Sequence, residues 1–173
     1  MKTLKTLVFC LSIICFFSCD KNESEDLNNV SVERYIELLK EGKYESLELP
    51  EFTSKDIPEL LKSRNDNLMI MNFPINGISS LSLTECKLGM YVLWTIESIR
   101  SVAINSESLI GRFPSQNPIL ALRNSAELDL VYDDESQETA AKAYFDWWEE
   151  NKDKEFDEFK NIDPLIETEY WWH

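Results

Sequence analysis

Residues 84–105 read TECKLGMYVLWTIESIRSVAIN, and this stretch decides the fold. Its apolar side chains recur at helical spacing, at Leu88, Val92, Ile96, Ile99 and Ala103. The first half is apolar nearly all round, which predicts a central helix wrapped by neighbouring helices. Gly89 costs about 1 kcal/mol relative to alanine inside a helix. Its presence therefore indicates that another backbone passes close to this helix.

Glu97 and Arg100 stand three residues apart on the same predicted helix. Side chains at this spacing lie next to each other on a helix and can form an ion pair. Interior ion pairs are usually structural. We therefore expect the pair to organise the core and not to take part in a reaction.

Further helices are predicted on both sides of the central one. Ser31 can cap a helix over 31–41, and Gly42 can end it. A second helix is expected over 55–64 and a third over 136–151. The sequence thus predicts an all-α or strongly α-dominated fold, a small bundle whose paired helices loosely resemble HEAT-like repeats.

For each of two short segments, the sequence is compatible with a strand and with one other conformation. Residues 68–73 (LMIMNF) can form a short strand or an extended crossing segment, and residues 126–132 a helical turn or a strand. The turn residues Asn76 and Gly77 mark the tightest point of the loop that follows the first of them.

The first 18 residues have the pattern of a signal peptide. Lys2 and Lys5 precede an apolar run of 11 residues at 7–17. That run is shorter than the roughly 20 residues of a membrane-spanning helix. Ser18 is the small residue before Cys19, which resembles the lipobox cysteine of bacterial lipoproteins. The alternative is a simple secretory peptide, which would leave Cys19 as a free thiol.

The lipoprotein resemblance implies a location and an anchor. Cys19 would carry the lipid and hold the protein in the bacterial cell envelope, and we expect it at the outer membrane. Residues 19–29 (CDKNESEDLNN) are acidic and lack periodicity, so we expect a disordered tether, followed by a single helical domain over 30–173. The acidic run also resembles a surface-export signal of Bacteroides-like lipoproteins, whereas Asp20 marks inner-membrane retention in other Gram-negative bacteria.

The charge and the cysteines narrow the classes of partner. The formal net charge is −15, and loss of Lys2 and Lys5 with the signal peptide makes it more negative. Such a chain repels nucleic acid, so we expect no nucleic-acid partner. Cys86 is the one ordinary thiol left after processing and lipidation, which excludes an intramolecular disulfide and favours burial of this thiol.

Few residues indicate catalysis. His173 is the only histidine, which argues against Ser-His-Asp or Cys-His catalysis and against a multi-histidine metal site. The acids at Asp129 and 133–135 lack the spacing of a calcium loop, and we expect a solvated connection. We predict no catalytic residue, no metal, no cofactor besides the lipid on Cys19, and no enzyme. Carboxylates are plentiful, so a small carboxylate-dependent glycan hydrolase stays an alternative.

Aromatic residues make up 12% of the chain and include five tryptophans. They indicate more about function than the carboxylates do. We expect Trp94 and Trp148 in the core. Trp147, Trp171 and Trp172 are the candidate contacts for a partner, because exposed aromatic side chains can stack on sugars or anchor a protein.

Several phrases together resemble an uncharacterised family of short Bacteroides-type lipoproteins, a domain of unknown function. They are LPEFTSKDIPELLKSRND (49–66), NFPINGISS (72–80), LGMYVLWTIESIR (88–100), GRFPSQNPIL (111–120) and YFDWWEENK (144–152). The resemblance implies a single domain in the cell envelope and supplies no reaction. The expected function is a lipid-anchored binding or accessory module for an envelope protein or glycan. An inhibitor or immunity-type lipoprotein, with an acidic face that blocks a basic toxin, is a further alternative.

Overall fold

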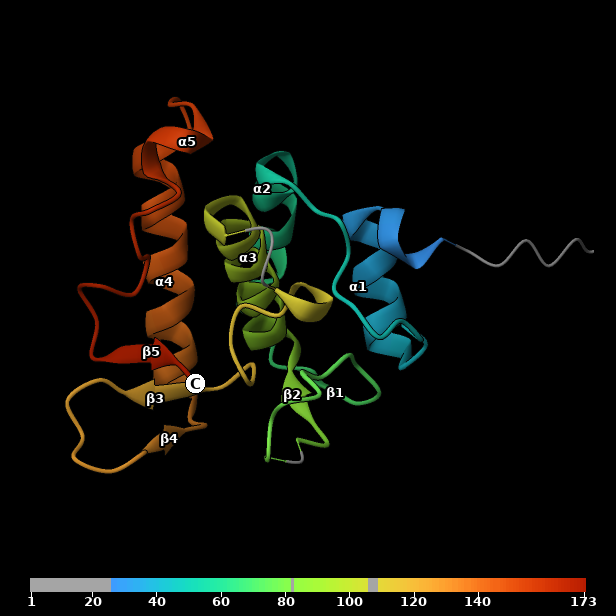
Figure 1. Cartoon of the computed structure of the whole chain (residues 1–173), viewed down its shortest axis with the longest axis horizontal. Coiled ribbons are helices and arrows are strands. Elements are labelled where there is room, and N and C mark those ends of the chain that lie inside the picture. The colour runs from blue at the N-terminus through green and yellow to red at the C-terminus, as the bar shows by residue number, and fades with distance from the viewer. Residues whose placement is uncertain (1–25, 82, 106–108) are drawn as a thin grey trace, which may run out of the picture.

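The computed structural model describes residues 26–81, 83–105 and 109–173 (Figure 1). The predicted signal peptide, Cys19 and most of the predicted tether lie outside these residues. Five α-helices are present in the described part: α1 (Val32–Glu41), α2 (Ile57–Leu60), α3 (Leu88–Asn105), α4 (Asp134–Asn151) and α5 (Phe156–Phe159). The strands are β1 (Met69–Ile70), β2 (Cys86–Lys87), β3 (Leu120–Leu122), β4 (Leu130–Val131) and β5 (Tyr170–Trp172).

The prediction of an all-α bundle with HEAT-like pairs is wrong, because the described chain is mixed α/β. β1 and β2 form a two-stranded antiparallel sheet, and a second antiparallel sheet has the order β4-β3-β5. In the second sheet Leu120 pairs with Val131 on one side and Trp172 on the other. Strands of two or three residues are too short to show the alternation of apolar and polar residues that identifies a strand in sequence.

The central helix begins later than predicted. α3 starts at Leu88, and the preceding Cys86 and Lys87 form β2, which pairs with Met69 and Ile70 of β1. The strand alternative for 68–73 is thus confirmed at its centre. The backbone N–H of Leu88 donates to Leu68 O, at 2.8 Å. This bond gives a partner to one of the N–H groups that the first turn of a helix leaves free.

α3 lies between α4 and α2, as Figure 1 shows and their contacts confirm. Tyr91 and Trp94 are fully buried on it. The close backbone approach predicted at Gly89 is confirmed, since a Cβ at this position would lie 2.4 Å from Arg64 O. That carbonyl belongs to the turn that follows 3₁₀ helix η3 (Leu61–Ser63).

The flanking helices agree with the prediction to different extents. Ser31 caps α1 by accepting a hydrogen bond from the Arg34 N–H at 3.2 Å, and Gly42 ends it with φ of 64°. The single helix expected over 55–64 is instead three short pieces, η2 (Ser54–Asp56), α2 and η3. The segments at 27–29 and 110–112 are also 3₁₀ helices, η1 (Leu27–Asn29) and η4 (Ile110–Arg112).

The predicted ion pair is present and belongs to a buried network. Arg100 Nη2 lies 2.6 Å from Glu97 Oε1, and its Nε donates to Oε2 at 3.0 Å. Tyr144 of α4 donates its hydroxyl to Glu97 Oε2 at 2.6 Å, and the Trp172 indole donates to that hydroxyl at 2.7 Å. Arg100 Nη1 also donates to Lys160 O. The network therefore ties α3 to α4, β5 and the end of α5.

The last residues of the predicted tether pack against the domain. η1 is held by the Tyr44 hydroxyl, which donates to Leu27 O at 3.1 Å, and by the Glu51 N–H, which donates to Asn28 O at 2.8 Å. Leu27 is partly buried against the core. Across the described ranges, no helix combines the length and the apolarity that crossing a bilayer requires.

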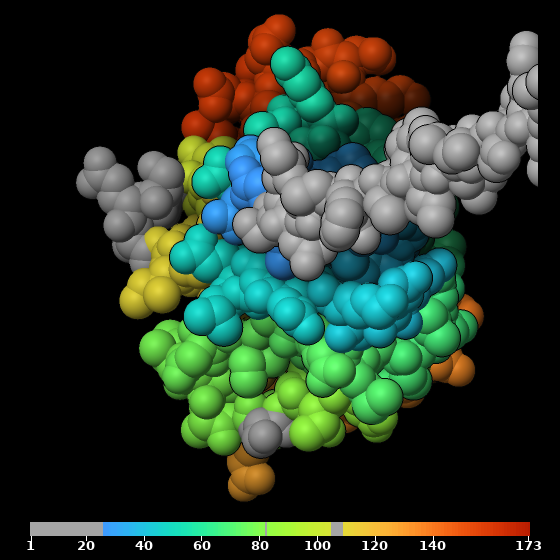
Figure 2. Space-filling model, turned by 90° about the vertical axis from the view of Figure 1, so that its right-hand side faces the viewer, coloured from blue at the N-terminus to red at the C-terminus, as the bar shows by residue number. Residues whose placement is uncertain are grey.

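One face of the molecule is built largely from irregular chain. In Figure 2 the segment that follows β1, in green, covers the lower part of this face beneath the α1–α2 link, in cyan. Met71, Ile75 and Ile78 of this segment are 61%, 47% and 73% exposed. Apolar side chains therefore reach the surface next to β1.

Candidate functional site

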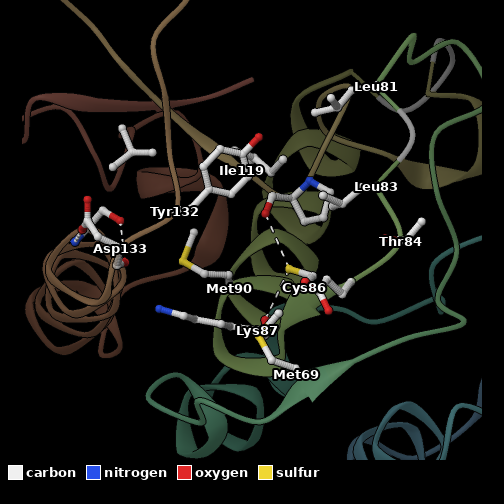
Figure 3. Close-up of a pocket in the computed structure, with 14 residues that line it drawn as sticks. Met69, Leu81, Leu83, Thr84, Cys86, Lys87, Met90, Ile119, Tyr132 and Asp133 are labelled. Carbon is white, nitrogen blue, oxygen red and sulfur yellow. Dashed lines mark hydrogen bonds between the residues drawn. The ribbon is translucent and has the colours of Figure 1, made fainter.

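The best-formed pocket lies between the two small sheets, which Figure 1 shows at the same end of the molecule. Its volume is about 380 Å³. The lining comes from four separate segments: β1, residues 81–90 with β2 and the start of α3, residues 118–119, and residues 131–136 (Figure 3). Only the folded chain brings these segments together.

The floor and walls of this pocket are apolar. Cys86, Met90 and Ile119 are buried at its base. Leu81, Leu83, Met69, Val131 and Pro118 complete the apolar lining. Methionine side chains adapt to ligands of different shape, because they are unbranched and polarisable.

Polar side chains gather at the mouth of the pocket. Glu85 and Asp133 contribute carboxylates, and Lys87 contributes the one cation of the lining. The Lys87 ammonium is already paired with the Asp134 carboxylate. The mouth therefore carries net negative charge.

Asp133 has a second role as the N-cap of α4. Its Oδ1 accepts a hydrogen bond from the Ser136 N–H at 2.7 Å. This bond lowers the pKa of the Asp133 carboxyl, because it favours the ionised form. The acidic stretch that the sequence indicated as a solvated connection thus caps a helix and holds Lys87.

The negative field extends to the adjacent sheet. Burial raises the pKa of the Tyr170 hydroxyl, and the carboxylates of Glu169, Asp133 and Glu135 raise it further. Nearby negative charges disfavour a phenolate. The side of β5 that faces α4's first turn is therefore acidic as well.

Cys86 is a packed thiol at the base of the pocket. Its Sγ lies 3.4 Å from Lys87 O and 3.7 Å from Pro118 O, as a weak donor to both. Burial raises the pKa of this thiol to about 12. The expected burial is confirmed, and the thiol is protonated and unreactive at neutral pH.

We expect Cys86 to resist alkylation in the folded protein, because a thiol with a pKa of about 12 provides almost no thiolate at pH 8. Iodoacetamide treatment followed by peptide mass spectrometry measures this, with and without urea. Leu47→Cys, at a position that is 88% exposed, is the matched control and should be alkylated without urea. Equal labelling of the two thiols would contradict the buried placement.

We expect Asp133→Ala to lower the free energy of unfolding by about 1 kcal/mol at pH 7, the usual contribution of an N-cap. The folded-state pKa of Asp133 is below its ordinary value of 3.8, so its contribution is complete above that value and is lost as pH falls through the folded-state pKa. Urea unfolding at pH 7 and pH 3 measures the change. Asp153→Ala, at an exposed acid outside any cap, should stay within about 0.5 kcal/mol of the parent at both pH values.

The candidate tryptophans occupy different environments. Trp147 is 5% exposed and contacts Tyr144 and Phe159 in the core, so it offers almost no surface to a partner. Trp172 is partly buried and donates to Tyr144. Trp171 is 44% exposed on β5 and is the one of the three that presents its ring to solvent.

The expected core tryptophans also differ from each other. Trp94 is fully buried, which confirms the prediction, whereas Trp148 packs only partly against the core. Trp147 takes the buried position instead. The three candidate contacts do not line the apolar pocket, so the structure does not join them into one site.

A larger and more open groove of about 730 Å³ runs along α4 beside residues 162–168. Its lining combines polar and apolar side chains, Trp147 among them, and several of the charged side chains already pair with each other. Lys142 pairs with Asp146, and Lys154 donates to Asn151 Oδ1 at 2.7 Å. We favour the first pocket over this groove because the groove is more open to solvent.

Within the described residues no group of three or more histidine, cysteine or acidic side chains is placed to hold a metal ion. His173 lies at the sheet, where its Nδ1 is 2.9 Å from Asn117 Nδ2 and its backbone N–H donates to Ile119 O. The lone histidine is thus engaged in holding the end of β5.

Sequence reasoning missed most of the pocket. Cys86 and Asp133 drew attention as individual residues, but nothing indicated that they share a site. Leu81, Leu83 and Tyr132 lie in loops, where isolated apolar residues carry no periodic signal. An apolar run interrupted by turn residues, as at 75–83, was the one available hint.

The fold and the pocket define a small mixed α/β domain with an apolar cavity between two short sheets. The family described as domain of unknown function (DUF4943) matches residues 26–173. The chain belongs to this family. Searches of curated proteins and of solved structures each gave no match.

Proposed function

We propose that this chain is a lipid-anchored binding protein of the bacterial cell envelope, and that it binds its partner in the pocket of Figure 3. The lipobox-like sequence before Cys19 and the resemblance to Bacteroides-type lipoproteins support the anchor and an outer-membrane location. Each buried methylene of an acyl chain contributes about 0.8 kcal/mol, so several chains on Cys19 would hold the protein stably.

The observation that carries the binding function is the composition of the pocket. An apolar base with a few polar groups at the mouth is the usual construction of a ligand site, and about 380 Å³ falls within the usual size range. The base is built from side chains of two of the four segments. Such a cavity can receive an apolar group and exclude water from it.

The hydrolase alternative has less support. A glycosidase needs one carboxylic acid that stays protonated, with a raised pKa, beside a second carboxylate. Of the two acids that line the pocket, Asp133 caps α4 and has a lowered pKa. The geometry at Asp133 therefore favours binding over acid catalysis.

Replacing the predicted lipidation site tests the anchor. We expect Cys19→Ala to move the protein from the membrane fraction to the soluble fraction and to abolish incorporation of an alkyne-labelled fatty acid. Cys15→Ala, within the predicted signal peptide, is the matched control and should change neither. A Cys19→Ala protein that still fractionates with membranes would refute the lipoprotein proposal.

Filling the pocket tests the binding site. Fluorescence of N-phenyl-1-naphthylamine, a neutral apolar probe, should rise when it enters the pocket of the Cys19→Ala chain. We expect Val131→Trp to reduce this binding about tenfold, because the larger ring occupies part of a cavity of about 380 Å³. Leu47→Trp adds the same ring at an exposed position elsewhere and should have no effect. Equal probe binding by the two variants would exclude this pocket.

A further inference from the structure

We propose that the occupant of this pocket is a segment of a partner protein in which a bulky apolar side chain stands next to lysine or arginine. The inference rests on the proposed function, since it names the ligand class of the same pocket. Three observations carry it. They are the apolar base, the apolar surface that continues beyond the mouth, and the acidic rim, which is formed by Glu85 and the acids of residues 127–135.

The base fits an apolar anchor of limited size. A volume of about 380 Å³ lies near the lower end of ligand sites. Met90 and Ile119 are buried there, and Cys86 is protonated, so the base offers no charge to a ligand. A large aromatic or aliphatic side chain fills such a space well, and buried anchors of this kind dominate protein interfaces.

The apolar surface extends past the mouth, which favours a protein over a small molecule. Met69 and Tyr132 line the pocket from opposite sides of Cys86 (Figure 3), yet they are 46% and 59% exposed. Met71 and Leu128, in the segments next to β1 and β4, are 61% and 58% exposed. A small ligand in the cavity would leave this surface uncovered, whereas exposed methionine and aromatic side chains around a cavity are typical of protein interfaces.

The rim selects for positive charge. Residues 127–135 contain five acids and no base, and the acids are exposed. Glu85, in the segment before β2, adds another carboxylate to the lining, and Asp134 pairs with Lys87. A basic segment is attracted to this rim and an acidic one is repelled, which steers association and suppresses wrong partners.

Designed peptides test the inference on the Cys19→Ala chain. The first has one central tryptophan between two pairs of lysines and a dansyl label. In the second peptide glutamates replace the lysines, and in the third alanine replaces the tryptophan. We expect measurable binding of the first peptide alone, weakening as salt rises from about 0.05 to about 0.3 M, because salt screens exposed charges.

Two variants locate the contacts. Val131→Trp should reduce binding of the lysine–tryptophan peptide about tenfold by filling the cavity. Glu85→Gln combined with Glu135→Gln should weaken it about fivefold at low salt. Asp133 is left intact because it caps α4. Glu33→Gln combined with Glu51→Gln removes the same charge near α1 and should leave affinity unchanged.

The outcomes separate this inference from the proposed function. If the neutral probe binds the pocket but the lysine and glutamate peptides bind equally, or neither binds, the basic-segment inference is overturned and the pocket stands. If the Glu33 and Glu51 pair has the same effect as the rim pair, the rim is not the recognising surface. If the probe itself does not bind, the pocket and this inference fail together.

Discussion

Arg100→Ala should lower the free energy of unfolding by about 3 kcal/mol. The Arg100 and Glu97 side chains are only 12% and 8% exposed, and the substitution leaves the Glu97 carboxylate buried with the Tyr144 hydroxyl and no positive charge beside it. Removing one partner of a buried ion pair usually costs about 3–5 kcal/mol. We expect the lower end of this range because Tyr144 still donates to Glu97. Urea unfolding followed by tryptophan fluorescence measures the change.

Two further variants separate the buried charge from the loss of a side chain. Lys142→Ala removes a cation from the exposed pair with Asp146 on α4 and should change stability by less than about 0.5 kcal/mol. Glu97→Gln combined with Arg100→Met keeps an acceptor for Tyr144 and leaves no charge, so it should be more stable than Arg100→Ala. An Arg100→Ala protein as stable as Lys142→Ala would show that the network contributes little.

Gly89→Ala should lower the free energy of unfolding by about 2 kcal/mol, although alanine is the better helix former. The new Cβ would lie 2.4 Å from Arg64 O and 2.5 Å from Gln137 Nε2. Overpacking costs about 1–3 kcal/mol in a well-packed core. The Arg64 contact is to a backbone carbonyl, which cannot rotate away, so we expect a cost at the upper end, about 3 kcal/mol, against a gain in helix propensity of about 1 kcal/mol.

Gly77→Ala is the matched control for Gly89→Ala. No atom lies within 4 Å of a Cβ at Gly77, so we expect a change within about 0.5 kcal/mol. Thermal and urea unfolding of both variants measure the difference. A Gly89→Ala protein as stable as the parent would show that η3 and α3 can move apart enough to admit the methyl group, and it would contradict this prediction.

Local signals in the sequence predicted several parts of the fold correctly. The two ends of α1 were predictable from Ser31 and Gly42, because a hydroxyl cap and a left-handed glycine depend on only a few adjacent residues. Gly89 predicted the close approach and Cys86 the buried thiol for the same reason. Each of these inferences depended only on the conformational or burial preference of one residue type at its own position.

Long-range pairing was not predictable from the same signals. β3 pairs with β5 across the whole of α4 and α5, and each strand has only three residues. The buried stripe of α4 includes polar Gln137 and Asn151, which hydropathy does not mark as core. The sequence therefore indicated Trp148 as the inward side chain, whereas the structure buries Trp147. The pocket was missed because it depends on both sheets.

The central position of β3 has a consequence for synthesis. Leu120–Leu122 pair with β4 soon after they are made, but their second partner, Tyr170–Trp172, follows only after α4 and α5. The indole that donates to Tyr144 arrives with the same strand. Because a chain is produced from its N-terminus, the sheet and the Glu97 network stay incomplete on the ribosome until β5 has left it. A chain proposed to cross a membrane thereby keeps this sheet and the Glu97 network unfinished until β5 has been made.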